Sequence, residues 1–345
     1  MHLLPTQFVA SPMHHPDGAV ARLAGGMGWF AAYELLGPER RTVPVAEVAS
    51  LGSEALAIHA RVTAPRPPLT LGGRTLRFDQ PRVAGILNVT PDSFSDGARH
   101  AGDPAAAAAA GVDMLAAGAA LVDVGGESTR PGAATVWEGD EIARVVPVVE
   151  RLAAAGALLS VDTRKAAVME RALAAGAAIV NDVSALLWDP RAVEVVARAG
   201  CPVVLMHSPD PASGGHGRGG YADVLTDVYD WLAARVAAAR AGGVRDVIVD
   251  PGIGFGKTLA ENLRLLNGLA LFHGLDCPVM LGASRKRLIG ALSNEAPVGE
   301  RLGGSVALAL RGAEAGVQLL RVHDVAETAQ ALRVWRGLRD QALTG

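Results

Sequence analysis

The chain has 345 residues, of which 50% are hydrophobic and 19% are charged, and its formal net charge is −3. This weakly negative balance, with arginines dispersed along the chain, excludes a sequence-independent attraction to nucleic acid. The longest apolar runs are interrupted by glycine or charged residues well before the roughly 18 residues that a membrane span needs. The length suits two average domains or a single α/β barrel with one large core.

Residues 1–64 form an extension in which the sequence shows no chemical motif. The chain start lacks the positive segment and the continuous apolar core of a secretory signal, so we expect a cytoplasmic protein. An apolar stretch at 21–37, ARLAGGMGWFAAYELLG, is compatible with a short helix. The proline-rich segment 61–69, RVTAPRPPL, marks the expected boundary between this extension and a second domain, 65–345.

Two short alternating runs around Gly72-Gly73, within residues 69–82, predict a β-hairpin. We expect this hairpin to plug the floor of the domain that follows. From about residue 83 onward, β-branched runs alternate with alanine-rich segments of helical period, which is the signature of repeated βα units. We predict eight strands, at 83–90, 120–126, 158–163, 178–184, 202–208, 246–252, 278–284 and 319–324.

The predicted strands are apolar on consecutive residues rather than on alternate ones, which indicates that both faces of the sheet are covered. Eight such units favour closure of the sheet. The predicted fold class is therefore α/β, a (β/α)8 TIM barrel with an N-terminal hairpin and an additional extension. Cys201 and Cys277 each precede Pro-Val at the start of an apolar run, so we predict buried free thiols rather than a disulfide or a metal pair.

A polar residue stands at the end of nearly every predicted strand, which is where parallel barrels carry their chemistry. An isolated Asp or Asn there is often a cap or a satisfied core group, but a set on successive strands indicates a binding site. The set comprises Asn88, Asp162, Asn181, Asp250, Ser284, Lys286, Arg321 and His323. Buried Asp beside Asn can accept the paired N–H groups of a guanidine-like heterocycle. Lys286, Arg321 and His323 can bind an anion such as a diphosphate.

The motifs around these residues resemble dihydropteroate synthase in content and order. They are ILNVTPDSFSDG, GGESTRPG, VDT, VND, LMH, DPGIGFGK, SRK and RVHDV, within about residues 69–345. The first two are long enough that a chance match is negligible. The resemblance implies an alkyltransferase of folate biosynthesis, which condenses 6-hydroxymethyl-7,8-dihydropterin diphosphate with 4-aminobenzoate to give 7,8-dihydropteroate and diphosphate. It also implies a homodimer.

The resemblance assigns residues to each part of the first substrate. The residues implied for the pterin ring are Asp162, Asn181, Met206, Asp250, Phe255 and Lys286. The residues implied for the diphosphate are Asn88, Thr129, Arg321 and His323. Met206 and Phe255 can equally be plain core, because an apolar residue at a strand end serves either purpose.

A dissociative, SN1-like reaction is implied, in which Asp162 and Asp250 stabilise the cation that forms at the pterin methylene. Arg321 and His323 would stabilise the leaving diphosphate. Asn88 would act through Mg²⁺, an ion that keeps several waters and is held mainly by phosphate oxygens. The residues implied for catalysis are Asp162, Asp250, Lys286, Arg321 and His323.

Two glycine-flanked loops, around residues 92–95 and 128–131, are expected to be mobile lids that complete a pocket for 4-aminobenzoate. The residues implied there are Phe94, Ser128, Thr129, Arg130, Pro131, Lys286 and Arg287. Asp92 and Arg130 can instead be solvated loop charges. Sulfonamides imitate aminobenzoate, so we expect them to compete for this pocket. The family often has a small hydroxyl residue where Arg287 stands, so either Arg287 supplies its charge or backbone N–H groups of the helix expected near Arg285 suffice.

Three points stay open at the level of sequence. His207, in the LMH motif, has no implied role, and we expect it to make a structural hydrogen bond. A methyltetrahydrofolate:corrinoid methyltransferase shares the pterin-binding barrel, but it has no diphosphate for Arg321 and His323 to bind. An inactive pterin-binding paralogue, acting as a regulator or scaffold through residues 1–64, is the other alternative.

Overall fold

The computed structural model describes residues 1–37, 39–90, 102–128, 134–211, 217 and 219–344. Within these residues, eight parallel strands form one sheet, in the order β12, β11, β10, β9, β8, β7, β14, β13. The strands are β7 (Arg82–Asn88), β8 (Leu121–Gly125), β9 (Leu159–Asp162), β10 (Ile179–Asp182), β11 (Val203–Met206), β12 (Val247–Asp250), β13 (Met280–Leu281) and β14 (Leu319–Val322). This sheet carries the polar strand ends predicted from the sequence.

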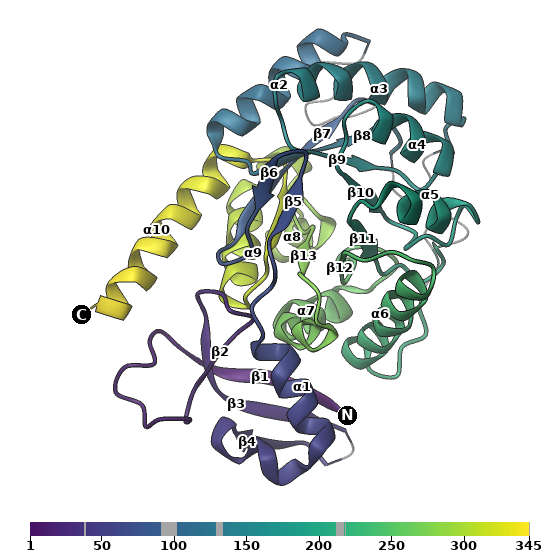
Figure 1. Cartoon of the computed structure of the whole chain (residues 1–345). Coiled ribbons are helices and arrows are strands. Elements are labelled where there is room, and N and C mark those ends of the chain that lie inside the picture. The colour runs from purple at the N-terminus through teal and green to yellow at the C-terminus, as the bar shows by residue number, and fades with distance from the viewer. Residues whose placement is uncertain (38, 91–101, 129–133, 212–216, 218, 345) are drawn as a thin grey trace.

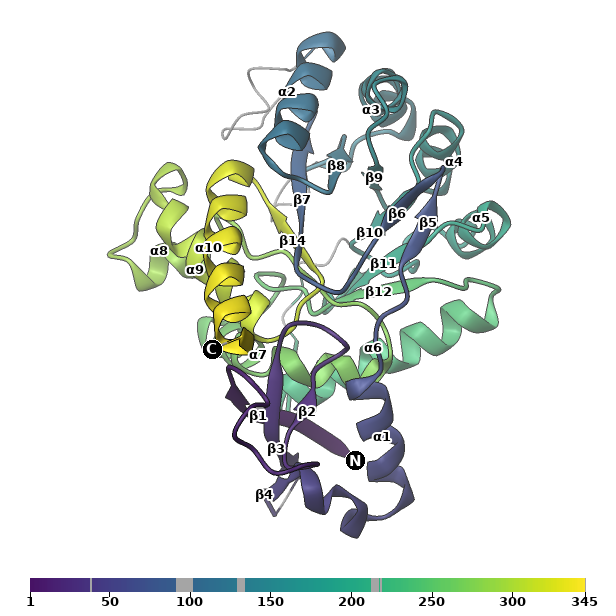
Figure 2. The ribbon, with the colours of Figure 1, turned by 60° about the vertical axis from the view of Figure 1, so that its left-hand side comes forward.

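The sheet closes on itself. A parallel bridge joins Val249 of β12 to Val279, next to β13, and the Val249 N–H donates to the Pro278 carbonyl at 2.9 Å. The predicted α/β barrel is confirmed, and Figures 1 and 2 show helices around its outside.

The helices that follow the strands cover the outer face of the barrel. They are α2 (Pro104–Ala117), α3 (Glu138–Ala154), α4 (Ala166–Ala174), α5 (Ala192–Ala199), α6 (Val224–Ala241), α7 (Leu259–Asn267), α8 (Arg287–Leu292), α9 (Leu302–Glu314) and α10 (Val325–Thr344), with short 3-10 helices η4 (Leu269–Leu275) and η5 (Val298–Glu300). Among the described residues, no helix combines the length and the apolar composition needed to cross a bilayer.

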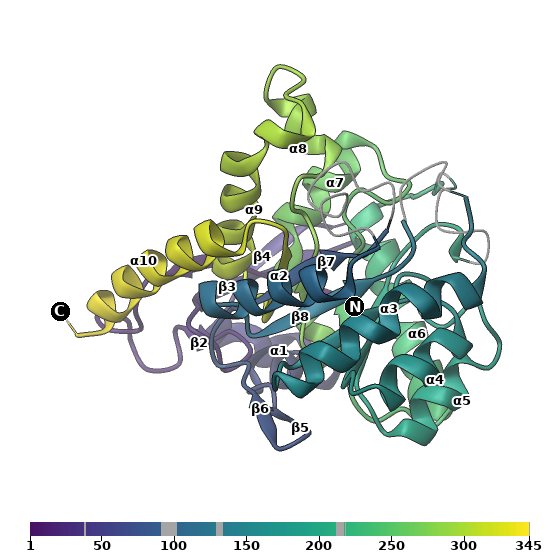
Figure 3. The ribbon, with the colours of Figure 1, turned by 90° about the horizontal axis from the view of Figure 1, so that it is seen from above.

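The predicted hairpin is present and closes the floor of the barrel. Its strands are β5 (Leu69–Leu71) and β6 (Arg74–Leu76), and Gly72 and Gly73 both take positive φ, as the tight turn requires. The apolar side chains of Leu69, Leu76 and Phe78, in and just after the hairpin, belong to one buried cluster. The cluster also contains one residue near the start of each barrel strand: Ala84, Leu121, Leu158, Ile179, Val204, Ile248, Met280 and Leu319. Figure 3 shows the hairpin at the end of the molecule opposite α8.

The extension is a small antiparallel sheet with one helix. Its elements are β1 (His2–Val9), β2 (Ala21–Arg22), β3 (Trp29–Leu36), β4 (Arg41–Pro44), the 3-10 helix η1 (Val45–Leu51) and α1 (Ser53–Thr63). The stretch 21–37, which the sequence made compatible with a short helix, contains the strands β2 and β3 instead, so that interpretation was wrong. Trp29, Phe30 and Tyr33 belong to a strand that pairs with both β1 and β4, and these long-range pairings override a short apolar pattern that does not distinguish helix from strand.

Arg66 fastens the extension to the barrel. Its side chain is almost fully buried and forms an ion pair with Asp276 at 2.7 Å. It also donates to the backbone carbonyls of Arg61 at 3.0 Å and His273 at 2.7 Å. The end of the extension, the linker and η4 are thus joined through one guanidinium.

Arg66→Ala should lower the free energy of unfolding by about 2–4 kcal/mol, because it leaves buried carbonyl groups and one carboxylate without their donor. Urea denaturation measures the change. Arg77→Ala is the matched control, since Arg77 pairs with Asp79 on the surface, and its cost should stay within about 1 kcal/mol. Equal effects of the two substitutions would contradict this role for Arg66.

Candidate functional site

A cavity of about 940 Å³ opens at the carboxyl ends of the barrel strands. The predicted site residues that line it are Asn88, Ser128, Asp162, Phe255, Ser284, Lys286, Arg287, Arg321 and His323. Asn181, Met206 and Asp250 lie at the ends of β10, β11 and β12 and are buried. The strand pairing places Asn181 beside Asp162, and Met206 beside Asp250. The prediction that strand-end polar residues gather at one mouth is confirmed.

Arg321 is bound to two carboxylates at the base of this cavity. Its Nε donates to Oδ2 of Asp123 at 2.6 Å, and its Nη2 donates to Oδ2 of Asp162 at 2.6 Å. The same oxygen of Asp123 accepts the Nδ2 of Asn181 at 3.0 Å. The sequence prediction grouped Arg321 with the diphosphate ligands, and the structure places its guanidinium among the carboxylates assigned to the ring.

Asp123 was missing from the predicted site. It lies within β8 rather than at its end, is 2% exposed, and its Oδ1 has no hydrogen-bond partner among the described residues. A carboxylate inside an otherwise apolar parallel strand was the signal that could have found it, since such strands are buried on both faces.

Burial and mutual charge shift the ionisation of this group. Burial raises the pKa of Asp162 to about 7, and the charge of Asp123 adds to the rise, although Arg321 opposes it. Burial disfavours the charged form of Arg321, but attraction to Asp123 and Asp162 outweighs burial and raises its pKa above the usual range. The guanidinium therefore stays charged beside a carboxyl that titrates near neutral pH.

Asp250 is held by the backbone that follows it. Its Oδ1 accepts the N–H of Gly252 at 2.7 Å, and burial raises its pKa. A Cβ placed on Gly282, in the loop after β13, would lie 3.5 Å from Oδ2 of Asp250. A side chain at position 282 would therefore contact the second oxygen of Asp250.

The loop after β12 is folded around Lys257, a residue that the sequence prediction did not single out. Its ammonium donates to the carbonyls of Gly252 at 2.8 Å and Phe255 at 3.3 Å. Burial lowers the pKa of Lys257 to about 7, although Asp250 opposes the shift. The folded loop presents the Phe255 ring to the cavity, where the ammonium of Lys286 lies 4.0 Å from its centroid, a cation–π distance.

The start of α7 completes this loop. Thr258 Oγ1 accepts the N–H of Glu261 at 3.2 Å, and the Glu261 carboxylate accepts the N–H of Thr258 at 2.6 Å. This capping box satisfies backbone donors at the helix start and so fixes the point at which the loop ends.

Asn88 and His323 stand at the ends of the neighbouring strands β7 and β14. Ser284 Oγ accepts the His323 N–H at 3.2 Å and lies 3.1 Å from its Nδ1. No hydrogen bond joins the Asn88 side chain to another described residue. The described residues also contain no cluster of three or more His, Cys, Asp or Glu side chains that could hold a metal ion. A metal here would have Asn88 as its protein ligand and would need oxygens from a bound phosphate group.

Arg285 and Arg287 face different surroundings. Arg285 takes a left-handed φ of 57° and forms a two-pronged ion pair with Asp324. The helix expected near Arg285 is α8, which begins at Arg287 and has only six residues. Arg287 is exposed and lines the cavity. Its side chain is thus the group on this helix that can meet an anion at the rim.

Four of the residues predicted for the aminobenzoate pocket lie outside the described residues: Phe94, Thr129, Arg130 and Pro131. Asp92 also lies outside them. Ser128 is described and lines the cavity.

His207 is buried by aromatic packing. Its ring lies edge-on to Trp231, with centroids 4.9 Å apart, and burial lowers its pKa to about 3. The structural hydrogen bond expected for its side chain is absent at Nδ1, which has no partner among the described residues. The free thiols of Cys201 and Cys277 are buried, as predicted.

Comparison with known proteins agrees with this geometry. A model of the family "Pterin binding enzyme" matches residues 84–323. The dihydropteroate synthase of Escherichia coli strain K12 is 44% identical over 265 residues, which cover 76% of this chain and 93% of that protein.

Two solved structures are similar over most of their length. The Xanthomonas albilineans dihydropteroate synthase with 4-aminobenzoic acid has a TM-score of 0.74 and 47% identity, and the match covers 79% of this chain and 98% of that chain. A complex of the Yersinia pestis dihydropteroate synthase with a sulfonamide drug has a TM-score of 0.75 and 44% identity, with 80% and 100% covered. The extension, residues 1–64, precedes the region that the family model matches.

The raised pKa of Asp162 predicts a pH-dependent stability. Because its pKa rises from 3.8 to about 7 on folding, the folded chain binds a proton in this window that the unfolded chain has released. Asp162 therefore lowers stability as the pH rises through the window. Asp162→Asn removes this effect, so the unfolding free energy of the variant minus that of the natural chain should increase between pH 4 and pH 7, by up to about 1.4 kcal/mol per pH unit. Urea unfolding at both pH values measures the difference, and a constant difference would contradict the shift.

Proposed function

Because the chain belongs to the dihydropteroate synthase family of pterin-binding enzymes, we propose that it condenses 6-hydroxymethyl-7,8-dihydropterin diphosphate with 4-aminobenzoate. The products are 7,8-dihydropteroate and diphosphate, and the enzyme is an alkyltransferase of folate biosynthesis. One observation carries this proposal. Carboxylates and an amide from successive strands converge at one barrel mouth, beside cations suited to a diphosphate.

The pterin ring would bind where the strand-end acceptors lie. Asp162, Asn181 and Asp250 are each at most 8% exposed, and hydrogen bonds to buried carboxylates discriminate strongly for ligands that supply paired N–H donors. Lys286, at the cavity wall, would meet the carbonyl side of the ring. Phe255 and Met206 would pack against its faces. These roles rest on position and chemistry together.

The diphosphate would bind towards Asn88, Arg321 and His323, with Thr129 as the fourth predicted ligand. Asn88 and His323 line the cavity at neighbouring strand ends. The amide oxygen of Asn88 suits Mg²⁺, which prefers oxygen ligands and is commonly held by few protein groups together with phosphates. When bound, Mg²⁺ would neutralise charge on the leaving diphosphate.

The residues of the site suit a dissociative substitution. The C–O bond to the diphosphate breaks, and the methylene carbon then forms a C–N bond with the amine of 4-aminobenzoate, which loses a proton. Asp162 and Asp250 supply negative charge near the cation that forms between these two events. Arg321 and His323 supply donors to the departing anion.

Arg287 supports binding of the aminobenzoate carboxylate. Its exposed guanidinium lines the cavity one residue after Lys286, and guanidinium groups bind carboxylates through paired N–H donors. Ser128 lies across the same cavity. We propose that this rim, with Phe94, Thr129, Arg130 and Pro131, forms the aminobenzoate pocket and that sulfonamides compete for it. The homodimer and the cytoplasmic location stay predictions, and sedimentation velocity tests the first.

The direct test is a diphosphate-release assay with both substrates and Mg²⁺. We expect diphosphate to form at a rate that depends on both substrates, and the organic product to be 7,8-dihydropteroate. A protein that binds the pterin substrate but gives no turnover would contradict the proposal and would favour an inactive pterin-binding paralogue.

Asp250→Asn should weaken binding of the pterin diphosphate by about 1–3 kcal/mol, because the amide presents a donor where the ring also has one. Isothermal titration calorimetry measures the affinity. Asp246→Asn is the control, since Asp246 precedes the same strand and is exposed. Unchanged affinity in Asp250→Asn would refute the assignment of Asp250 to the ring.

A further inference from the structure

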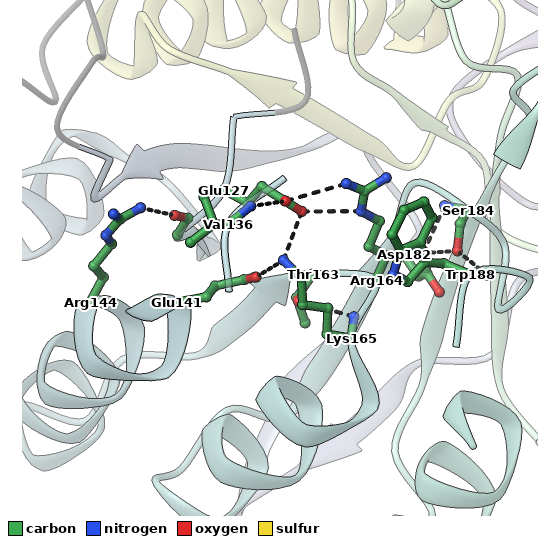
Figure 4. Close-up of polar contacts among 11 residues, drawn as sticks. Glu127, Val136, Glu141, Arg144, Thr163, Arg164, Lys165, Asp182, Ser184 and Trp188 are labelled. Carbon is green, nitrogen blue, oxygen red and sulfur yellow. Dashed lines mark hydrogen bonds and ion pairs between the residues drawn. The ribbon is translucent and has the colours of Figure 1, made fainter. Parts of the chain in front are cut away.

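Glu127 is the centre of a buried charge cluster beside the cavity (Figure 4). We propose that Glu127 is a positioning residue, which fixes the neighbouring Ser128 and the Val136 backbone against the segment after β9 and thereby sets how tightly 4-aminobenzoate binds. The proposal rests on the function proposed above, because it concerns the second substrate of that reaction.

The Glu127 carboxylate joins three points of the chain. Its Oε1 accepts the N–H of Val136 at 2.9 Å, nine residues further along. Its Oε2 accepts Nε of Arg164 at 3.1 Å and Nζ of Lys165 at 3.0 Å. Arg164 and Lys165 follow Asp162 by two and three positions. Glu127, which precedes Ser128, and Val136 are therefore tied to the segment that begins at a predicted pterin ligand.

The cluster extends to α3 and to the loop after β10. Lys165 also forms an ion pair with Glu141 of α3, which is fully buried. The guanidinium of Arg164 stacks on the Trp188 ring, 3.7 Å from its centroid. With two carboxylates and two cations, the cluster is electrically balanced. Buried ion pairs lose their hydration and stabilise a fold little relative to apolar residues, so a fixed geometry is the advantage that this cluster offers.

The backbone before Glu127 packs tightly against α3. A Cβ on Gly126 would lie 2.7 Å from Cγ2 of Val145 and 2.9 Å from Cγ of Glu141, both on α3. The Gly126 carbonyl also accepts Nη1 of Arg144 at 3.2 Å. The contacts of Gly126 with α3 therefore fix where the Glu127 side chain begins. The hydrogen bond from the Val136 N–H to the Glu127 carboxylate ties Val136 to the same position.

The same contacts argue against Glu127 as the base that takes the proton of the amine. Glu127 lines the cavity, so this role has to be considered. Burial raises its pKa, but the hydrogen bonds from Val136, Arg164 and Lys165 outweigh burial and lower it. Both oxygens already accept donors, and a carboxylate with a lowered pKa is a weak base. Glu127 acts through the neighbouring residues that it holds, Ser128 and Val136.

Glu127→Gln tests the proposal, because it keeps the shape and removes the charge. We expect the KM for 4-aminobenzoate to rise about tenfold or more, because loss of the Glu127 charge displaces groups that bind this substrate. The KM for the pterin diphosphate and kcat should each change by less than about threefold, because Arg321 still holds Asp162 from the other side. A general loosening of the fold would instead move the constants of both substrates.

Three controls make the outcome decisive. Glu150→Gln, on the exposed side of α3, should leave all constants unchanged. If Glu127→Gln does not fold, Arg164→Lys keeps the charge but loses one N–H contact and the planar stacking group, and it should show the same selective rise in KM. Equilibrium binding of the pterin diphosphate, which needs no turnover, distinguishes a failure of the positioning role from a failure of the proposed function. A natural chain that binds this substrate without turnover refutes the proposed function alone.

Unchanged KM for 4-aminobenzoate in a folded, active Glu127→Gln variant would overturn the positioning role. A large fall in kcat at constant KM, with a displaced pH profile, would overturn it as well, because that pattern identifies a catalytic base.

Discussion

Two carboxylates and one guanidinium share the base of the barrel mouth, and the rest of the site is arranged around them. Asp123 and Asp162 are nearly excluded from solvent, and both bind Arg321 at 2.6 Å. Burial disfavours an unpaired charge, so the pairing with Arg321 lowers the cost of placing two carboxyl groups side by side there. Asn181 is held through Asp123. The position of one arginine therefore fixes two of the three acceptors that we propose for the pterin ring, Asp162 and Asn181, whereas the Gly252 backbone holds the third, Asp250.

Charged side chains also hold the segments that surround this base. Lys257 folds the loop that presents Phe255, Arg285 and Asp324 join the segments after β13 and β14, and Glu127 joins those after β8 and β9. In each case a buried or half-buried charge binds backbone groups or an opposite charge. These contacts position groups at the rim of a rigid barrel, so their loss should affect substrate binding before it affects the fold.

Most of the barrel could be predicted because its strands are short apolar runs that end in polar residues, and this pattern depends on local sequence. Asp123 was missed because it stands inside a strand, and Lys257 because its partners are backbone carbonyls, which leave no pattern in the sequence. The Arg321 partners come from β8 and β9, which are distant in the chain. The strand β3 was mistaken for a helix because its pairing with β1 is also long-range.

Calorimetric titration of 6-hydroxymethyl-7,8-dihydropterin, which lacks the diphosphate, into Arg321→Lys tests whether this guanidinium organises the ring-binding acceptors. A lysine keeps the charge but cannot bind two carboxylates through a planar fork, so Asp123 and Asp162 should lose their common geometry. We expect an affinity at least about tenfold lower than that of the natural chain, in a variant that remains folded. An unchanged affinity would contradict the claim that this guanidinium organises the ring-binding acceptors.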